Sequence, residues 1–353
     1  MTNLKILITG AGAPGILGTL YSLKKNFDNR NVYIIGTDSN LEVVGRYVCD
    51  KFFQIPHSSL RVEYLESMEK ICHDEGVDII IPQNTFELSL LSEMKKVFER
   101  IGTRILVSNP EAIEISNNKY RLMKKCNEIG LPVGKFKVAN NFEDLRNFAK
   151  KIGWPEKKVV IKPPISNGLR GVRIIDENFD SKKAFYSEKP TSLTTKMDDL
   201  YRIIGDSFPE LIVTEFLSGI EYTVDVFRYN GQSIAIPRVR EMIRSGITFT
   251  GKTVKHKKII EYSQTLSQSI GLEYCFGFQF KLDEKDCPKI LESNPRVQGT
   301  MVLSTFSGVN IIYLSVKALL GESFDLPKVN WNTCLLRYWG GIAVLDEKQI
   351  GRL

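Results

Sequence analysis

The sequence predicts an α/β protein that begins with a doubly wound parallel sheet and continues into an α+β part with antiparallel sheets. Strand and helix patterns alternate through residues 1–112, which is typical of parallel βαβ units. Further along, strands follow one another in pairs, and Asn230-Gly231 between two of them is a strong hairpin signal. Because 353 residues are too many for one ordinary core, we expect more than one domain.

The elements of the first part follow from its apolar periodicity. β-branched and apolar runs predict strands at 5–9, 32–36, 77–82 and 104–108. Helical spacing covers a segment ending near Lys25 and the segments 62–74 and 86–100. The N-terminal residues lead directly into the first strand without a signal-peptide pattern, so we expect a cytoplasmic protein.

The amino-acid composition indicates which kinds of ligand and partner the protein is expected to bind. Charged residues make up 25% and hydrophobic residues 42%, and no apolar run approaches the ~20 residues of a membrane helix. Six cysteines without C-x-x-C spacing and only three histidines argue against a disulfide framework and a histidine-based zinc site. The net charge is +7, but no long basic block accompanies it. We therefore expect small anionic ligands, with no nucleic acid and no membrane partner.

A glycine-rich segment after the first strand offers one reading of the function. Gly10, Gly12 and Gly15, with Asp38 at the end of the second strand, match the dinucleotide-binding fingerprint. An NAD-dependent oxidoreductase is therefore one hypothesis. No obvious hydride-transfer constellation follows, and a glycine turn at a helix N-terminus can hold another anion or none. We place this hypothesis second.

Two lysines lie at sequence positions that are unusual for a lysine. Asn117 or Asn118 can cap a helix, and Lys119 lies in its first turn, where the helix dipole disfavours a cation. Lys162 lies in the apolar strand 159–163, although lysine is rarely buried without a partner. An anionic ligand would explain both positions, and a solvated lysine is the alternative for each.

The loop between the strands that end at Lys162 and begin at Val172 contains small residues. Ser166 and Gly168 belong to the segment Ser-Asn-Gly-Leu-Arg-Gly. Such a loop can form a mobile flap whose backbone N–H groups contact phosphate. A simple hairpin loop without a ligand is the alternative.

A second constellation predicts a metal site. Glu292 and Asn294 are two residues apart at the end of a strand, so they share one face, and Gln279 lies in the preceding strand. If Leu282 pairs with Lys289 across the turn, Gln279 lies opposite Glu292. Carboxylate and amide oxygens suit Mg²⁺, with Mn²⁺ as the alternative ion. A surface hairpin with polar residues in solvent is the other interpretation.

Arginines follow the Asn230-Gly231 turn. Arg238, Arg240 and Arg244 lie within seven residues, beside the loop Ser245-Gly246. Planar guanidinium groups suit a carboxylate, so we predict that these residues bind an anionic substrate. A basic sheet edge that faces solvent is the alternative.

In this order the motifs resemble the ATP-grasp superfamily, and most closely its members of the carbamoyl-phosphate-synthetase large-subunit type. The matching segments are N-N-K119-Y, V-V-I-K162-P, S-N-G-L-R-G-V, V-T-E215-F-L-S-G-I-E221-Y-T-V-D225, G-F-Q279-F and L-E292-S-N294-P-R296. The resemblance covers Met1 to about Gly321 and implies a two-lobed ATP-grasp fold behind a Rossmann-like pre-ATP-grasp domain. The domains expected are this Rossmann-like domain at 1–112, a small lobe with the phosphate loop at 113–211, a large lobe with the metal site at 212–330, and a tail at 331–353.

The resemblance also implies a role for each matching residue. Lys119 and Lys162 would hold ATP phosphates, and the loop with Ser166 and Gly168 would close over them. Glu215 and the Phe216-Leu217 segment would recognise adenine, and Glu221 would bind the ribose. Mg²⁺ would be bound by Gln279, Glu292 and Asn294. Arg296 would contact the transferring phosphoryl group or the acyl phosphate.

The expected function is therefore an ATP- and Mg²⁺-dependent ligase that joins a carboxylate to an amine or a similar nucleophile and releases ADP and phosphate. An oxidoreductase and a non-catalytic ATP-binding module are the alternatives. Lys162, Gln279, Glu292 and Asn294 argue against loss of turnover. The expected partners are small-molecule carboxylate and amine substrates, with a homodimer left open.

Overall fold

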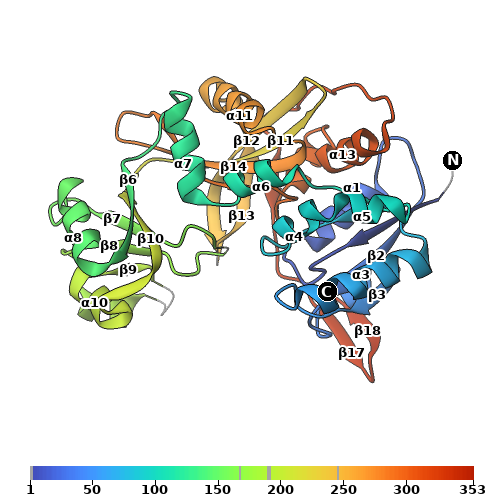
Figure 1. Cartoon of the computed structure of the whole chain (residues 1–353), viewed down its shortest axis with the longest axis horizontal. Helices are drawn as coiled ribbons and strands as arrows, with labels where there is room; N and C mark the ends of the chain where they lie inside the picture. The colour runs from blue at the N-terminus through green and yellow to red at the C-terminus, as the bar shows by residue number, and fades with distance from the viewer. Residues whose placement is uncertain (1–2, 167, 189–191, 245) are drawn as a thin grey trace. The chain divides into compact units, whose positions relative to one another are not determined.

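The computed structural model describes residues 3–166, 168–188, 192–244 and 246–353 (Figure 1). Asn167 of the expected flap and Ser245 beside the arginines lie outside these ranges. The chain forms two compact units, and each is described by itself. The first contains Met1–Asn117, Tyr222–Gln279 and Ser293–Leu353, and the second contains Asn118–Glu221 and Phe280–Glu292. Within the described ranges, no helix has the length and apolar character needed to cross a membrane.

A five-stranded parallel sheet forms the N-terminal part of the first unit. Its strand order is β3-β2-β1-β4-β5, and every neighbouring pair is parallel. The strands are β1 (Leu4–Ile8), β2 (Val32–Asp38), β3 (Lys51–Gln54), β4 (Ile79–Ile81) and β5 (Arg104–Ile105). This topology confirms the predicted doubly wound sheet. The order reverses between β1 and β4, the point at which such sheets usually bind ligands.

Helices cover both faces of this sheet because successive side chains of each strand point to opposite faces. Ile6 and Ile8 share a core with α1 (Ile16–Lys24) and α13 (Ile311–Leu320). Leu7 belongs to the core on the other face. The helices contributing to that second core are α3 (Arg61–Glu75), α4 (Leu88–Glu93), α5 (Lys95–Arg100) and α6 (Pro110–Ser116), and the short α2 (Gly45–Val48) follows β2.

A six-stranded sheet has the order β15-β14-β11-β12-β13-β16. Its strands are β11 (Glu221–Tyr229), β12 (Gln232–Arg244), β13 (Ile247–Thr253), β14 (Tyr274–Leu282), β15 (Pro288–Asn294) and β16 (Cys334–Leu336). Asn230 and Gly231 have φ of 46° and 79°, and Tyr229 pairs with Gln232, so the predicted two-residue hairpin is confirmed. The remaining elements are α11 (Lys257–Ile270), α12 (Val302–Phe306) and the β17 (Ile342–Leu345) and β18 (Lys348–Arg352) hairpin.

The second unit contains its own five-stranded sheet, in the order β6-β10-β7-β8-β9. Its elements are α7 (Lys119–Glu128), β6 (Phe136–Asn141), α8 (Phe142–Lys151), β7 (Val159–Lys162), β8 (Arg173–Ile175), α9 (Ser181–Ser187), β9 (Thr194–Thr195), α10 (Met197–Ile204) and β10 (Ser207–Glu215). Val159 and Ile161 of β7 pack with α8 and α10. Alternation therefore places Lys162 on the opposite face of this sheet.

The domain boundaries expected after residues 112, 211 and 330 stay predictions. β10 pairs with β6 between Ser207 and Thr214 and with β7 between Ile212 and Glu215, and it therefore runs through the boundary expected after residue 211.

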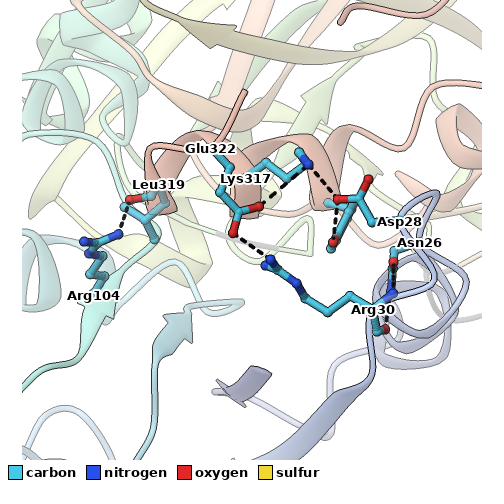
Figure 2. Close-up of polar contacts among 8 residues, drawn as sticks. Asn26, Asp28, Arg30, Arg104, Lys317, Leu319 and Glu322 are labelled. Carbon is cyan, nitrogen blue, oxygen red and sulfur yellow. Dashed lines mark hydrogen bonds and ion pairs between the residues drawn. The ribbon is translucent and has the colours of Figure 1, made fainter. Parts of the chain in front are cut away.

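Inside the first unit, ion pairs join the loop after α1 to the end of α13 (Figure 2). The Lys317 ammonium lies 2.6 Å from the Asp28 carboxylate, and the Arg30 guanidinium lies 2.7 Å from Glu322. Burial opposes ionisation of Asp28, but hydrogen bonds from Lys317 and Tyr313 outweigh it and hold its pKa below the usual value. These contacts fix α13 against the parallel sheet.

Candidate functional site

The two unusual lysines lie together in the second unit. Asn118 caps α7 by accepting hydrogen bonds from two backbone N–H groups, as one of the two predicted caps, and Lys119 follows it. Lys119 and Lys162 are each only 6% exposed. Lys119 Nζ lies 3.4 Å from Glu292 Oε2, and Lys162 Nζ donates to the Leu291 carbonyl at 3.1 Å. A half-buried carboxylate and two buried ammonium groups therefore lie near one another.

The Lys162 ammonium group is buried, so water solvates its charge only weakly. Burial lowers the pKa of its ammonium to about 8; nearby Glu292 opposes this effect and nearby Lys119 adds to it. Two clustered cations with only partial compensation favour an anionic ligand. Because the pKa is lowered, the folded state gains stability as the pH rises from about 8 towards the ordinary value of 10.5.

The first prediction concerns pH. ATP affinity is expected to fall as the pH rises above about 8, because Lys162 then loses the proton that attracts phosphate. The limiting slope is about tenfold per pH unit for one proton. Dissociation constants measured by calorimetry across this range test it. Lys162→Arg, which stays charged, should lack this component, and an unchanged pH profile in that variant would contradict the assignment.

Lys119 is hydrogen-bonded to Ser166, at the start of the expected flap. The Lys119 Nζ donates to the Ser166 carbonyl at 3.2 Å and contacts the Ser166 hydroxyl at 3.1 Å. Its backbone N–H donates to the Pro164 carbonyl at 2.9 Å. Gly168 has φ of 59° in the turn that follows. A phosphate ligand at Lys119 would therefore lie beside this loop, and the flap role of Ser166 and Gly168 stays a prediction.

The residues expected at adenine lie at the end of β10 and directly after it, in the same unit. Glu215 is the last residue of β10, Phe216 follows it, and Leu217 is buried. The Lys281 and Lys158 ammonium groups lie 5.2 Å and 5.8 Å from the centre of the Phe216 ring. Two cations beside an aromatic ring form an electropositive margin. These lysines were not predicted from the sequence, because neither has a recognisable partner there.

Glu221 begins β11 in the second unit and is half-buried. Its charge opposes the effect of burial on the Lys162 pKa, so the two side chains interact. The ribose role of Glu221 stays a prediction.

The predicted metal ligands are divided between the two compact units. Glu292 belongs to the second unit, and Gln279 and Asn294 belong to the first. All three are half-buried residues of the neighbouring strands β14 and β15. Their convergence on one ion stays a prediction.

The turn between β14 and β15 differs from the expected pairing. Asp283 N–H donates to the Cys287 carbonyl at 3.0 Å, and Asp286 N–H donates to the Asp283 carbonyl at 3.1 Å. Asp286 has φ of 55°, so the loop is a three-residue turn. At the turn, this closure places Leu282 opposite Pro288, one residue away from the assumed partner Lys289. The turn therefore does not support the expected placement of Gln279 opposite Glu292.

Arg296 is held by residues of its own unit. Its guanidinium donates to the Thr85 hydroxyl at 3.3 Å, the Val297 carbonyl at 2.9 Å and the Asn294 side-chain oxygen at 3.3 Å. Arg296 is thus connected directly to a predicted metal ligand. Its contact with a phosphoryl group stays a prediction.

The three predicted substrate arginines have different environments. Arg238 is 2% exposed and forms two hydrogen bonds with Asp225, at 3.0 and 3.1 Å. Arg240 is half-buried and donates to the Thr248 hydroxyl at 3.0 Å. Arg244 is exposed and lies 4.7 Å from the Phe249 ring centre. Arg240 also donates to the Gly246 carbonyl at 2.6 Å, and the substrate roles of Arg240 and Arg244 stay predictions.

Arg238 instead joins a buried polar cluster. Its Nη2 donates to Gln298 Oε1 at 3.0 Å, and Ser304 Oγ donates to Asp225 Oδ2 at 2.7 Å. The hairpin register pairs Thr223 with Arg238 and therefore brings Arg238 near Asp225 on the same face. The sequence contained this signal, because the Asn230-Gly231 turn sets the register.

The glycine loop after β1 has structural reasons for its glycines. A Cβ on Gly12 would lie 2.7 Å from a Val43 methyl carbon, and a Cβ on Gly15 would lie 2.6 Å from the Gly299 Cα. The Asp38 carboxylate, which would bind ribose in a dinucleotide site, accepts the Gly12 N–H at 2.8 Å. Close packing thus accounts for this motif without a nicotinamide cofactor.

The second prediction follows from this packing. NADH and NADPH are expected to show no saturable binding, because the acid of the fingerprint already contacts the loop and no hydride-transfer residues accompany it. A fluorescence titration with each cofactor is the measurement. Micromolar binding of either cofactor would restore the oxidoreductase hypothesis.

Two protein-family models match parts of the chain. A protein-family model described as "ATP-grasp in the biosynthetic pathway with Ter operon" matches residues 207–335. The chain carries an ATP-grasp domain. A second model, "PylC-like, N-terminal domain", matches residues 6–106, which contain the parallel sheet. The resemblance inferred from the ordered motifs is confirmed.

One related sequence is the C-terminal section of the carbamoyl phosphate synthase large chain of Methanopyrus kandleri. It is 24% identical over 241 residues, which are 65% of this chain and 41% of that protein. The chain therefore spans less than half the length of this relative.

Two solved structures share the ATP-grasp fold across nearly the whole chain. Biotin carboxylase of Campylobacter jejuni, in a β,γ-ATP complex, has a TM-score of 0.68 and 19% identity, covering 93% of this chain and 73% of that one. The biotin carboxylase domain dimer of Hydrogenobacter thermophilus 2-oxoglutarate carboxylase, with MgADP, ADP and bicarbonate, has a TM-score of 0.68 and 17% identity, covering 93% and 72%. These similarities confirm the predicted fold class.

Proposed function

We propose that this chain is an ATP- and Mg²⁺-dependent ligase that activates a carboxylate as an acyl phosphate for attack by an amine or a similar nucleophile. The observation that carries the proposal is the grouping of Lys119, Lys162 and Glu292 in one unit of a chain with an ATP-grasp domain. Two buried cations suit the phosphates of ATP, and the neighbouring carboxylate suits their counter-ion.

The reaction consists of two transfers. A carboxylate oxygen attacks the γ-phosphorus, the bond to the β,γ-bridging oxygen breaks, and ADP leaves. The nucleophile then attacks the acyl carbon and expels phosphate. Lys119 and Lys162 would neutralise phosphate charge, and Arg296 would contact the phosphoryl group. Positioning and charge neutralisation provide most of the catalysis in such transfers, so no protein nucleophile is required.

The donor set fits a hard divalent ion. Gln279, Glu292 and Asn294 offer one carboxylate and two amide oxygens, and no group of three His, Cys, Asp or Glu side chains suited to a metal was found among the described residues. Such oxygens suit Mg²⁺ or Mn²⁺ better than a thiophilic ion. When bound, Mg²⁺ would neutralise charge on the β- and γ-phosphates. The three side chains would hold it there.

Nucleotide binding would extend from the phosphates to the base within the second unit. We assign the adenine to Glu215, Phe216 and Leu217, and the ribose hydroxyls to Glu221. The flap with Ser166 and Gly168 would cover the phosphates and exclude water from the transfer.

The third prediction concerns the carboxylate substrate. Arg240→Ala is expected to raise the KM of the anionic substrate by about tenfold or more and to change that of ATP little, because a charge-assisted hydrogen bond is lost. Steady-state kinetics with each substrate varied in turn measure this. Arg202→Ala is the matched control, since Arg202 is an exposed arginine of α10 and is not among the predicted substrate residues. Equal small changes in both KM values would favour a solvated basic edge.

The proposal includes small-molecule substrates, a cytoplasmic location and a homodimer. All six cysteines are free, as in a reducing compartment. One structural neighbour was solved as a dimer. A non-catalytic ATP-binding module is the second candidate, and retention of Lys162, Gln279, Glu292 and Asn294 favours turnover over this alternative.

ADP release tests the ligase chemistry. The full chain is incubated with ATP, Mg²⁺ and a panel of carboxylates and amino acids, with hydroxylamine added as a general nucleophile. We expect carboxylate-dependent formation of ADP and phosphate in equal amounts, together with a hydroxamate. ATP binding without any carboxylate-dependent ADP across the panel would favour the non-catalytic module.

A further inference from the structure

We propose that Lys289, supported by Asp283, determines the base selectivity of the nucleotide site by holding Glu215 in place. The preferred nucleotide would then carry a 6-aminopurine rather than a 6-oxopurine. This inference rests on the proposed function, because it takes the base to lie at Glu215. Lys289 is a positioning residue in this account, since it acts through Glu215.

The three side chains form a continuous chain of charges within the second unit. Lys289 Nζ lies 2.7 Å from Glu215 Oε1 and 3.3 Å from Asp283 Oδ2. The side chains of Lys289, Glu215 and Asp283 are 18%, 24% and 19% exposed, so water screens them only in part. The ammonium group therefore bridges two carboxylates.

The far end of this chain is fixed by the three-residue turn. Asp283 Oδ1 accepts the backbone N–H groups of Lys285 and Cys287, both at 2.9 Å. Hydrogen bonds from these two groups hold the pKa of Asp283 below its usual value, although burial opposes them. The turn thus fixes Asp283, and Asp283 in turn helps to fix Lys289.

The Glu215 side chain also lies close to the backbone of Gly134. A Cβ on Gly134 would lie 3.2 Å from both Cγ and Oε1 of Glu215. The Glu215 N–H donates to the Lys135 carbonyl at 3.2 Å, which fixes the backbone at the same place. The hydrogen-bonded backbone and the contact of Oε1 with Lys289 together define the orientation of the carboxylate, and Gly134 leaves room for it.

This orientation leaves one carboxylate oxygen for a ligand. Lys289 contacts Oε1, and no polar partner of Oε2 is found in the described part of the chain. An ionised carboxylate only accepts hydrogen bonds. The 6-amino group of adenine can donate to Oε2, whereas the 6-oxo group of guanine would place two acceptors together. A site built for one donor rejects an analogue that lacks it.

The test compares ATP and GTP binding to the full chain with Mg²⁺ by calorimetry. Wild type is expected to prefer ATP. In Lys289→Met this preference should fall by about tenfold or more, mainly through weaker ATP binding, because Glu215 loses the cation that orients it. Lys289→Arg keeps the charge and should restore the preference. If Lys289→Met lacks the wild-type circular dichroism spectrum, Lys289→Gln takes its place.

Lys317→Met is the matched control, because it removes a lysine–carboxylate pair of 2.6 Å in the first unit. Its ATP-to-GTP ratio should equal that of wild type. An unchanged ratio in Lys289→Met, with wild type preferring ATP, would overturn this inference and leave the proposed function standing. Absence of binding of either nucleotide to wild type would overturn the proposed function and this inference with it.

Discussion

Glu292→Gln is expected to lower the rate of ADP formation by about 10²–10³, the usual effect of losing one charge-stabilising contact to a transition state. The change keeps size and hydrogen bonding but removes the only formal negative charge among Gln279, Glu292 and Asn294. It also removes the anionic partner of Lys119, which lies 3.4 Å away. The measurement is ADP release at saturating ATP over a range of Mg²⁺, with the best carboxylate of the panel.

Glu322→Gln is a suitable control for this experiment. Its side chain is 30% exposed and forms an ion pair with Arg30, and that of Glu292 is 28% exposed and pairs with Lys119. The control should retain wild-type turnover, because it lies outside the proposed site. Gln279→Ala should have a smaller effect than Glu292→Gln, since water can replace a neutral ligand. Near-wild-type turnover of Glu292→Gln would exclude Glu292 as the principal metal ligand.

Asp225→Ala is expected to destabilise the fold by about 3–5 kcal/mol, the typical cost of breaking a buried ion pair. Asp225 is fully buried, and Arg238 is 2% exposed. The substitution leaves the guanidinium charge in the interior without its carboxylate and leaves Ser304 Oγ without its acceptor. Urea unfolding followed by circular dichroism gives the change in free energy.

Two further variants test whether the loss of the buried ion pair causes this destabilisation. Glu93→Ala removes an exposed pair with Arg61 and should have a much smaller effect, because water screens that pair. The double variant Asp225→Leu/Arg238→Met should be less destabilised than Asp225→Ala, since it buries no unpaired charge. A small loss in Asp225→Ala would show that the cluster contributes little to stability.

The strongest sequence signals were those that depend on a few neighbouring residues. The Asn230-Gly231 hairpin, the cap at Asn118 and the strand–helix alternation of the first domain are all present in the structure. Each has a local cause, in backbone preference, capping or periodicity. The ordered motifs then indicated the ATP-grasp domain, which no single motif could have done.

Features without a strong local sequence pattern were missed. β3 is a short strand of partly exposed residues, and β13 contains Gly251, so neither has a strong strand pattern. The turn after β14 holds three residues because Asp286 adopts a left-handed conformation, and this conformation was not evident from sequence. A shift of one residue at the turn weakens the predicted register of Gln279 and Glu292.

Some features of the candidate site were predicted from the sequence and others were not. The burial of Lys119 and Lys162 agrees with the argument that each lysine has an unusual environment. The pairing of Lys289 with Glu215 requires strands that are far apart in the sequence to meet, and periodicity does not contain that information. The sequence thus indicated the charges that a phosphate ligand would need, but it did not indicate the side chains that orient them.

The most direct test of the account is calorimetry of ATP with Mg²⁺, performed on wild type and on Lys162→Met. We expect saturable binding of ATP to wild type and a loss of affinity in the variant, because a buried cation proposed to contact phosphate is removed. Absence of ATP binding to folded wild type would contradict the account. Equal affinities for wild type and Lys162→Met would contradict the placement of the phosphates.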